Sequence, residues 1–308
     1  MDLKHNNVAI DGINVHYVAA SPRSKTKVPR ARLVFLHGFP ECWQTWQQQL
    51  EYFSRDYHVI APDLPGYNLS DKPVDSEFYQ VPNLIKFIAK FIQAVAQNQK
   101  VTLVAHDWGG AIAWPLAAFN AYLIERLVII NAAHPSTFTR EMIHNQLQRQ
   151  KSEYIHSLIA EDGVELLSAD DYRYLKDKVL LSAKHGVFDQ QALQVYIRAW
   201  SQPGAINGML QYYRAMPQLA PSTEQTSDNG PVTATQDMHI PNIKITVPTL
   251  ILWGELDQAF VVETLDGIEE FVANCQIKRF ANASHWLQHE KSPEVNHAID
   301  EFIVQATN

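Results

Sequence analysis

The feature that most constrains the fold is a set of short apolar runs separated by longer segments with helical spacing. Most of these runs are rich in Val, Ile and Leu, and all are too short to be buried helices. Such runs favour strands buried on both faces, as in a parallel sheet. They read ARLVFLHG at 31–38, YHVIAPD at 57–63, KVTLVAHD at 100–107, ERLVIINA at 125–132, PTLILWGE at 248–255 and CQIKRFANA at 275–283.

Helical patterns occupy the segments between these runs. Apolar residues repeat at helical spacing in 82–98, a second helix is expected over 109–119, and the last begins near Pro293. A hairpin around Asp11-Gly12 precedes them, in residues 8–18. Strands that alternate with helices predict an α/β fold, a mostly parallel sheet with helices on both faces.

The alternation stops after Ala133 and resumes at Val247. Residues 134–216 have a helical composition without a clear buried strand, and 217–242 form a polar stretch that we expect to be a loop. The simplest prediction is a helical cap inserted into an α/β core. The first part of the core is predicted at 1–134, the cap and its following loop at 135–240, and the second part of the core at 241–308.

Composition narrows the class of protein. The 308 residues allow one large core, and 46% hydrophobic and 19% charged residues are ordinary for a globular protein. A net charge of −8 without a basic stripe argues against nucleic acid as a partner. Cys42 and Cys275 have no metal-ligand spacing, and no apolar run approaches the ~20 residues of a membrane helix. We expect a cytoplasmic protein without a membrane span, with reduced cysteines or, as the alternative, a single disulfide bond.

The most informative segment is LVAHDWGGAIAW at 103–114. A strand leads into Asp107, and a helix is expected after it. Ala105 and Gly109, two residues to either side, are small, as a sharp strand-to-helix turn requires. Hydrolases usually place a nucleophilic serine on such a turn, and here an aspartate takes its place. The alternative is that Asp107 only caps the helix.

Two further segments can supply an oxyanion hole. The sequence HGFP at 37–40 follows a predicted strand and can present the backbone amide of Phe39. The amide of Trp108 lies at the start of the helix after Asp107. Together they could stabilise negative charge that develops on an oxygen. A simple strand-end turn is the alternative interpretation of HGFP.

The remaining candidates follow later strands. The loop after LILWG carries Asp257, with Glu255 as the alternative acid, and His285 lies between the last predicted strand and the last helix. Nucleophile, acid and histidine thus occur in the order Asp107, Asp257, His285. All three fall at strand ends, where open α/β sheets place their sites.

These motifs resemble those of the α/β-hydrolase superfamily over nearly the whole chain. Within it, the sequence is similar to the epoxide hydrolases and haloalkane dehalogenases. The resemblance implies a helical cap over the active site, no metal or cofactor, and functions that range from detoxification to turnover of lipid epoxides. The segments that carry it are HGFPECWQTW at 37–46, APDLPGYNLSDKP at 61–73, AHDWGG at 105–110, LWGELD at 252–257 and SHW at 284–286.

A carboxylate nucleophile changes the chemistry. Asp107 could displace a leaving group at a saturated carbon and form an alkyl ester. A water activated by His285, which Asp257 orients, would then attack the carbonyl of that ester. An epoxide leaves as an alkoxide that needs a proton donor, whereas a halide needs only groups that hold an anion. The predicted cap should therefore distinguish the two substrates.

The segment YYRAM at 212–216 resembles the cap segment in which epoxide hydrolases carry a Tyr-Arg pair. Matching the arginine to Arg214 selects Tyr213 as the ring-opening tyrosine. Upstream, SEYIHSLIAED lies where the family carries its other tyrosine, which we match to Tyr154, with His156 as the alternative. Tyrosine is protonated at neutral pH, so both could donate to an epoxide oxygen. Ordinary packing of these rings is the competing interpretation.

The sequence therefore predicts an epoxide hydrolase that forms a vicinal diol from a small-molecule epoxide. A haloalkane dehalogenase is the alternative, because Trp108 could hold a halide; against it, Phe39 stands where many dehalogenases have an asparagine. Fluoroacetate dehalogenases carry arginines beside the nucleophile, where this chain has Trp108 and Ala111. A non-catalytic receptor that binds ligands under the cap is a third hypothesis, disfavoured by the complete triad. A homodimer through cap surfaces is also expected.

Overall fold

The structure is a computed structural model. It describes residues 3–22, 31–184, 186–220 and 238–305, together with the backbone of 225–227 and 230–232. Parts of the polar stretch at 217–242 therefore lie outside the described residues.

One eight-stranded sheet forms the centre of the fold, in the order β1-β2-β4-β3-β5-β6-β9-β10. The N-terminal hairpin pairs antiparallel and joins β4 antiparallel, and all the other neighbours are parallel. The α/β prediction is confirmed. The strands are β1 (Lys4–Ile10), β2 (Ile13–Ala20), β3 (Arg32–Leu36), β4 (His58–Pro62), β5 (Val101–His106), β6 (Ile124–Ile130), β9 (Thr249–Gly254) and β10 (Cys275–Phe280).

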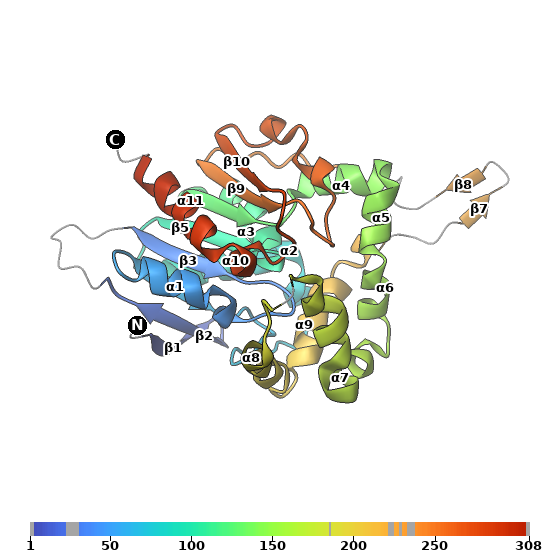
Figure 1. Cartoon of the computed structure of the whole chain (residues 1–308), viewed down its shortest axis with the longest axis horizontal. Coiled ribbons are helices and arrows are strands. Elements are labelled where there is room, and N and C mark those ends of the chain that lie inside the picture. The colour runs from blue at the N-terminus through green and yellow to red at the C-terminus, as the bar shows by residue number, and fades with distance from the viewer. Residues whose placement is uncertain are drawn as a thin grey trace.

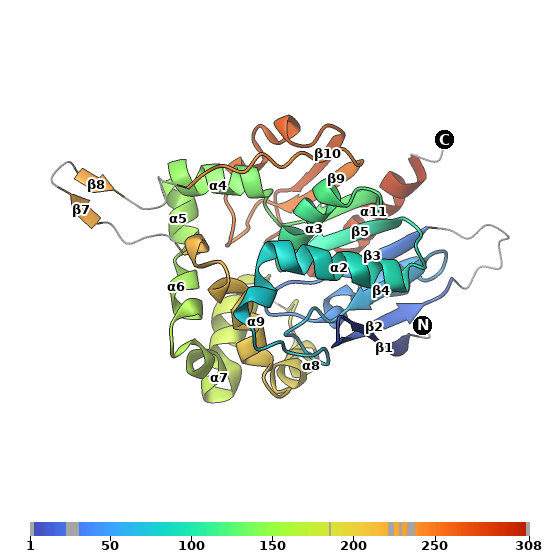
Figure 2. The ribbon, with the colours of Figure 1, turned by 180° about the vertical axis from the view of Figure 1, so that it is seen from behind.

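Helices cover both faces of this sheet. Along β3, Leu33 and Phe35 belong to one apolar core while Val34 and Leu36 belong to the other, the alternation expected of a strand buried on both faces. The helices α1, α10 and α11 lie on one face (Figure 1), and α2 and α3 lie on the other (Figure 2). Their bounds are α1 (Gln47–Phe53), α2 (Val81–Val95), α3 (Trp108–Phe119), α10 (Leu287–Glu290) and α11 (Ser292–Gln305).

The described part of the segment between β6 and β9 is mostly helical and stands beside the sheet at its carboxyl edge (Figure 1). The last of these helices, α9, approaches the core so closely that a side chain at Gly208 would collide with the backbone of Gly66, in the loop after β4. The helices are α4 (Pro135–His144), α5 (Gln146–Ser152), α6 (Tyr154–Ile159), α7 (Gly163–Tyr174), α8 (Gln190–Trp200) and α9 (Ala205–Arg214).

Short helical turns complete the described fold. Most lie in the loops of the core, and the π-helical turn at Leu175–Val179 extends α7. The turns are η1 (Trp43–Trp46), η2 (Ser76–Tyr79), η3 (Leu175–Val179), η4 (Leu180–Ser182), η5 (Pro217–Leu219), η7 (Val262–Leu265) and η8 (Ile268–Glu270).

Three details differ from the sequence expectations. Helix α2 ends at Val95, short of the predicted 98, because Gln97 and Asn98 adopt left-handed backbone angles. The predicted loop contains an antiparallel pair, β7 (Gln225–Ser227) and β8 (Gly230–Val232). Helix α1 had no counterpart among the predicted elements.

Both cysteines are free thiols, as expected, and Cys42 is buried. Among the residues that the structure describes, no helix has the length and apolar character needed to cross a membrane.

Candidate active site

Asp107 lies on a tight turn between β5 and α3. Its backbone angles, φ 50° and ψ −122°, are unusual for a residue other than glycine, and such strain tends to be kept at functional sites. The turn presses against the end of β3, since side chains at Gly38 or Gly109 would collide with Asp107 or with the Leu36 carbonyl. The small residue expected at position 109 is therefore required by a close backbone approach.

One carboxylate oxygen of Asp107 is held by the core. The amide of Phe39 donates to Asp107 Oδ1 over 2.6 Å. The Trp108 amide begins α3 directly after Asp107, but in the described part of the chain only the Phe39 amide bonds this carboxylate. The other oxygen, Oδ2, lies 3.7 Å from His285 Nε2.

His285 lies between Asp107 and Asp257. Its Nδ1 is 2.9 Å from Asp257 Oδ2, so Asp257 fixes the orientation of the ring. Asp257 is itself firmly held, because its Oδ1 accepts from the amides of Ala259 and Phe260, at 2.6 and 3.0 Å. The structure thus brings the three residues of the predicted triad together, although they come from the ends of β5, β9 and β10.

His285, Asp107 and Asp257 shift one another's pKa values through their charges and hydrogen bonds. Burial by itself would lower the pKa of His285, but the charge of Asp257 and the interactions with Asp107 outweigh it and raise the pKa to about 10. Burial would raise the pKa of Asp107, but the hydrogen bond and charge of His285 lower it below 3.8. The same balance lowers the pKa of Asp257. In the free protein, therefore, a protonated His285 sits between two ionised carboxylates.

The two candidate cap tyrosines stand over this turn. Tyr154 begins α6 and Tyr213 lies near the end of α9, and their ring centroids are 6.3 Å apart. The ring of Tyr213 packs edge-on against Phe39 and Trp108, at 5.3 and 5.1 Å between centroids. Arg214 ties the two helices together, because its guanidinium donates to the Ala160 carbonyl after α6 over 3.3 Å.

Both tyrosines are held in the protonated form. Burial raises the pKa of Tyr154, and the negative charge of Asp107 raises it further. Burial also raises the pKa of Tyr213, and the neighbouring Tyr154 and Asp107 raise it further. Each phenol therefore keeps its proton at neutral pH and presents an O–H donor.

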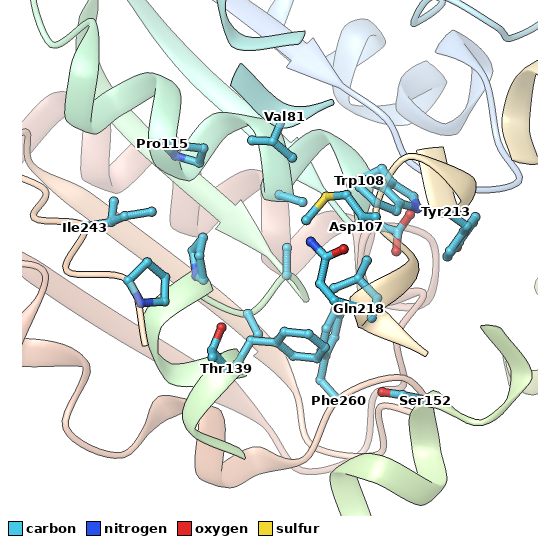
Figure 3. A pocket seen from close by; sticks show the side chains of 18 of the residues that line it. Val81, Asp107, Trp108, Pro115, Thr139, Ser152, Tyr213, Gln218, Ile243 and Phe260 are labelled. Atoms are coloured by element: carbon cyan, nitrogen blue, oxygen red, sulfur yellow. The ribbon is translucent and has the colours of Figure 1, made fainter. Parts of the chain in front are cut away.

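Two cavities meet at Asp107. A larger one of about 580 Å³ extends below the cap, and Figure 3 shows Asp107, Trp108 and Tyr213 at one end of it. A smaller one of about 160 Å³ also contains His285. Asp107, Tyr154 and Tyr213 line both cavities, so they flank the point where a substrate would react.

The alternative residues lie elsewhere. His156 is exposed and lines neither cavity, so the structure favours Tyr154 over it as the first cap donor. Glu255 forms an ion pair with Arg279 at 2.6 Å instead of approaching His285. No cluster of His, Cys, Asp or Glu among the described residues is arranged to hold a metal ion.

Asn131, at the end of β6, is a further residue of the site that no sequence motif indicates. Its Nδ2 donates to Asp257 Oδ2 over 2.7 Å and to the Gly254 carbonyl over 3.1 Å. Its Oδ1 accepts from the Gly254 amide over 2.9 Å. Asn131 therefore attaches the acid of the triad to two neighbouring strands, β6 and β9.

A second unidentified group is the buried carboxylate of Glu41, behind the HGFP turn. Its Oε1 lies 2.7 Å from His289 Nε2 and accepts from the hydroxyl of Tyr196 over 2.8 Å. Its Oε2 lies 3.5 Å from Nδ1 of His106, the residue before Asp107. Burial would raise the pKa of Glu41, but the charge of His289 and the hydrogen bonds to both histidines lower it. Glu41 thus connects α8 of the cap region with the turn that carries Asp107.

The sheet order and the arrangement of the triad are those of an α/β hydrolase, and a comparison with known families gives the same class. Residues 31–292 match the family model described as alpha/beta hydrolase fold. Human epoxide hydrolase 4 is 32% identical over 304 residues, which cover 96% of this chain and 77% of that protein. Epoxide hydrolase 2 of Caenorhabditis elegans is 30% identical over 306 residues, or 97% of this chain and 79% of that one.

Solved structures give the same result. A Bacillus megaterium epoxide hydrolase in complex with an inhibitor is 31% identical, with a TM-score of 0.81 over 97% of this chain and 99% of its own. The chain therefore belongs to the epoxide hydrolases of the α/β-hydrolase fold. It is a hydrolase enzyme.

Proposed function

We propose that this protein converts an epoxide to a vicinal diol through an alkyl ester on Asp107. The observation that carries the proposal is the convergence of Asp107, Tyr154 and Tyr213 on the same two cavities, with His285 3.7 Å from the nucleophile. Each group then has a role that its geometry and protonation support.

In the first step, Oδ2 of Asp107 attacks a ring carbon and the bond between that carbon and the epoxide oxygen breaks. The leaving alkoxide takes a proton from Tyr213 or Tyr154, whose raised pKa values keep them protonated until then. Oδ1, which the Phe39 amide already holds, becomes the carbonyl oxygen of the new ester. The oxyanion donor is thus in place before the ester forms.

Alkylation of Asp107 also prepares the second step. The ester carries no charge, so one of the two carboxylates that raised the pKa of His285 is lost. The pKa of His285 falls, and the ring can give up its proton and act as a base. The proton that His285 gives up replaces the one that the tyrosine donated to the alkoxide, so the second step begins with a neutral imidazole and two protonated phenols.

Hydrolysis follows at the carbonyl carbon of the ester. Neutral His285 removes a proton from water as the water oxygen attacks, and Asp257 stabilises the imidazolium that forms. When the tetrahedral intermediate collapses, the bond between the former ester carbon and the substrate oxygen breaks. This oxygen takes the proton of the newly formed Asp107 carboxylic acid, which releases the diol and regenerates the carboxylate beside the imidazolium of His285. One oxygen of that carboxylate then comes from water.

The tyrosine pair favours an epoxide over a haloalkane. A halide needs no proton, whereas this site aligns two protonated phenols beside the nucleophile. A mutant of the Bacillus megaterium relative, 31% identical to this chain, has been solved in complex with its product, a naphthyloxy-propane-1,2-diol. A diol product is what the proposed reaction gives.

The direct test compares two substrates. Purified protein is incubated with a terminal epoxide and, separately, with a bromoalkane of the same chain length. We expect vicinal diol from the epoxide and no bromide from the bromoalkane, and neither product with the matched variant Asp107→Asn. Bromide release without diol formation would instead establish the dehalogenase.

Three further expectations belong to this proposal. The cap is assigned to residues 135–240, between the two core segments. A cytoplasmic location stays a prediction. A homodimer through cap surfaces stays a prediction.

A further inference from the structure

The two cavities at Asp107 differ in chemistry as well as in size. The larger cavity is lined by aliphatic and aromatic side chains, including Val81, Pro115, Ile243 and Phe260 (Figure 3). Among the described residues that line it, Asp107 is the only one with an acidic or strongly basic side chain. Thr139, Ser152, Gln218 and His239 add a few polar groups, but most of the lining is apolar, so this cavity favours an apolar group over a charged one.

The smaller cavity holds the residues proposed for hydrolysis. Phe39, which supplies the oxyanion amide, and His285, which activates water, line only this cavity. Its remaining lining includes the polar side chains of Lys178, Ser182 and Gln258. Water must therefore enter this space for the second step to occur.

Size limits what else can enter. The smaller cavity, of about 160 Å³, is close to the ~150 Å³ that accommodates one benzene molecule. Because Asp107, Tyr154 and Tyr213 face it, part of the oxirane ring occupies this volume, and the attacking water needs roughly 30 Å³ more. An aryl or long alkyl group placed here would displace that water.

We propose that the substrates of this enzyme are oxiranes with one bulky apolar substituent, which lies in the larger cavity. The other ring carbon carries only hydrogen or a group of one or two heavy atoms, which lies in the smaller cavity beside His285. This inference rests on the proposed epoxide hydrolysis and adds to it which substituent occupies which side of Asp107.

The first test uses two substrates that differ by one phenyl ring, styrene oxide and trans-stilbene oxide. We expect kcat/KM for styrene oxide to exceed that for trans-stilbene oxide on the order of a hundredfold, because the second ring must enter the smaller cavity. Comparable values for both substrates would overturn the inference. A lack of diol from every epoxide, including propylene oxide, would instead contradict the proposed function itself.

The second test enlarges the smaller cavity. Val179 lines it from the π-helical turn, and Val179→Ala should raise the kcat/KM ratio of trans-stilbene oxide to styrene oxide about tenfold. Val187 is also half-buried but lines neither cavity at Asp107, so Val187→Ala is the matched control and should leave the ratio as in the wild type. An unchanged ratio in Val179→Ala would contradict the assignment of the second substituent.

The third test fills the larger cavity. Thr139 points into it from α4, and Thr139→Phe should lower kcat/KM for 1,2-epoxydodecane about tenfold relative to styrene oxide. His144 is exposed at the end of the same helix, and His144→Phe should preserve the wild-type ratio. A ratio that does not change in Thr139→Phe would show that the long chain lies elsewhere.

Discussion

The two halves of the active site are held in place by different means. In the core, Asp107 and Asp257 accept hydrogen bonds from backbone amides at strand ends. In the cap, Tyr213 is positioned by aromatic rings, those of Phe39, Trp108 and Tyr154. The core half is therefore set by the sheet itself, and the cap half depends on how the helices dock.

Two neighbouring tyrosines of α9, Tyr212 and Tyr213, differ in the same way, one contacting the core and the other facing the cavities. The hydroxyl of Tyr212 donates to the Pro65 carbonyl over 2.8 Å, so its function is to anchor the helix on the core. Tyr213 instead faces Asp107 and lines both cavities. One residue fixes the cap and the next one performs the proposed chemistry.

The largest expected effect is in the core. Asp107→Asn removes the nucleophile and should lower turnover at least about 10⁴-fold, on the scale of other nucleophile deletions. His285→Gln should still be alkylated but should not hydrolyse the ester. Mass spectrometry of His285→Gln after incubation with an epoxide should show an adduct on Asp107. An adduct-free protein that still opens epoxides would contradict the assigned roles.

The next effect is in the cap. Tyr213→Phe should lower epoxide turnover by about 10²–10⁴-fold, because the leaving alkoxide loses a proton donor. Tyr212→Phe is the matched control, since it removes an adjacent buried hydroxyl that faces the core, and it should retain most of the activity. Steady-state kinetics of both variants measure the difference. Equal losses would mean that the hydroxyls act only through packing of α9.

A third effect connects the two steps through charge. In the free protein, the pKa of His285 is raised to about 10, so its ring should remain protonated through neutral pH. The Asp107→Asn variant, like the ester, has no charge at this position. The pKa of His285 should therefore fall, and its imidazole ring should lose its proton at a lower pH than in the wild type. Titration by NMR measures the pKa of His285 in both proteins. An identical titration in the two proteins would break the proposed link between alkylation and base catalysis.

The smallest expected effect is on the connection between cap and core. Tyr196→Phe removes a donor from buried Glu41 and should lower the free energy of unfolding by about 1–3 kcal/mol. Tyr122 is an exposed tyrosine, and Tyr122→Phe should change that free energy by less than about 0.5 kcal/mol. Urea denaturation measures both. A change in Tyr196→Phe as small as in the control would show that this bond contributes nothing to stability.

The sequence predicted the core more completely than the cap. Apolar runs mark the strands, and each residue of the proposed triad lies in the turn or loop after one of them, so the sheet accounts for their convergence. Asn131 also follows a strand, but its contact with Asp257 leaves no motif in the sequence, because it depends on β6 and β9 being neighbours in the sheet. Glu41 was missed for the same reason, since its partner His289 is far away in the sequence.

In the cap, helical periodicity predicts helices but not how they dock. The close approach of Gly208 to Gly66, which brings α9 onto the core, leaves no periodic signal in the sequence. The match of Tyr213 and Tyr154 came from resemblance to a family, and the structure then placed both beside Asp107. Sequence alone also gave no sign that two cavities of unequal size meet there.

The most direct test of the central claim follows one oxygen atom. Excess enzyme is given a single turnover of an epoxide in water labelled with heavy oxygen, and the peptide that contains Asp107 is analysed by mass spectrometry. The mechanism predicts label in the Asp107 carboxylate and an unlabelled diol from that turnover. Label in the diol alone would show that water attacks the epoxide directly and would contradict the ester intermediate.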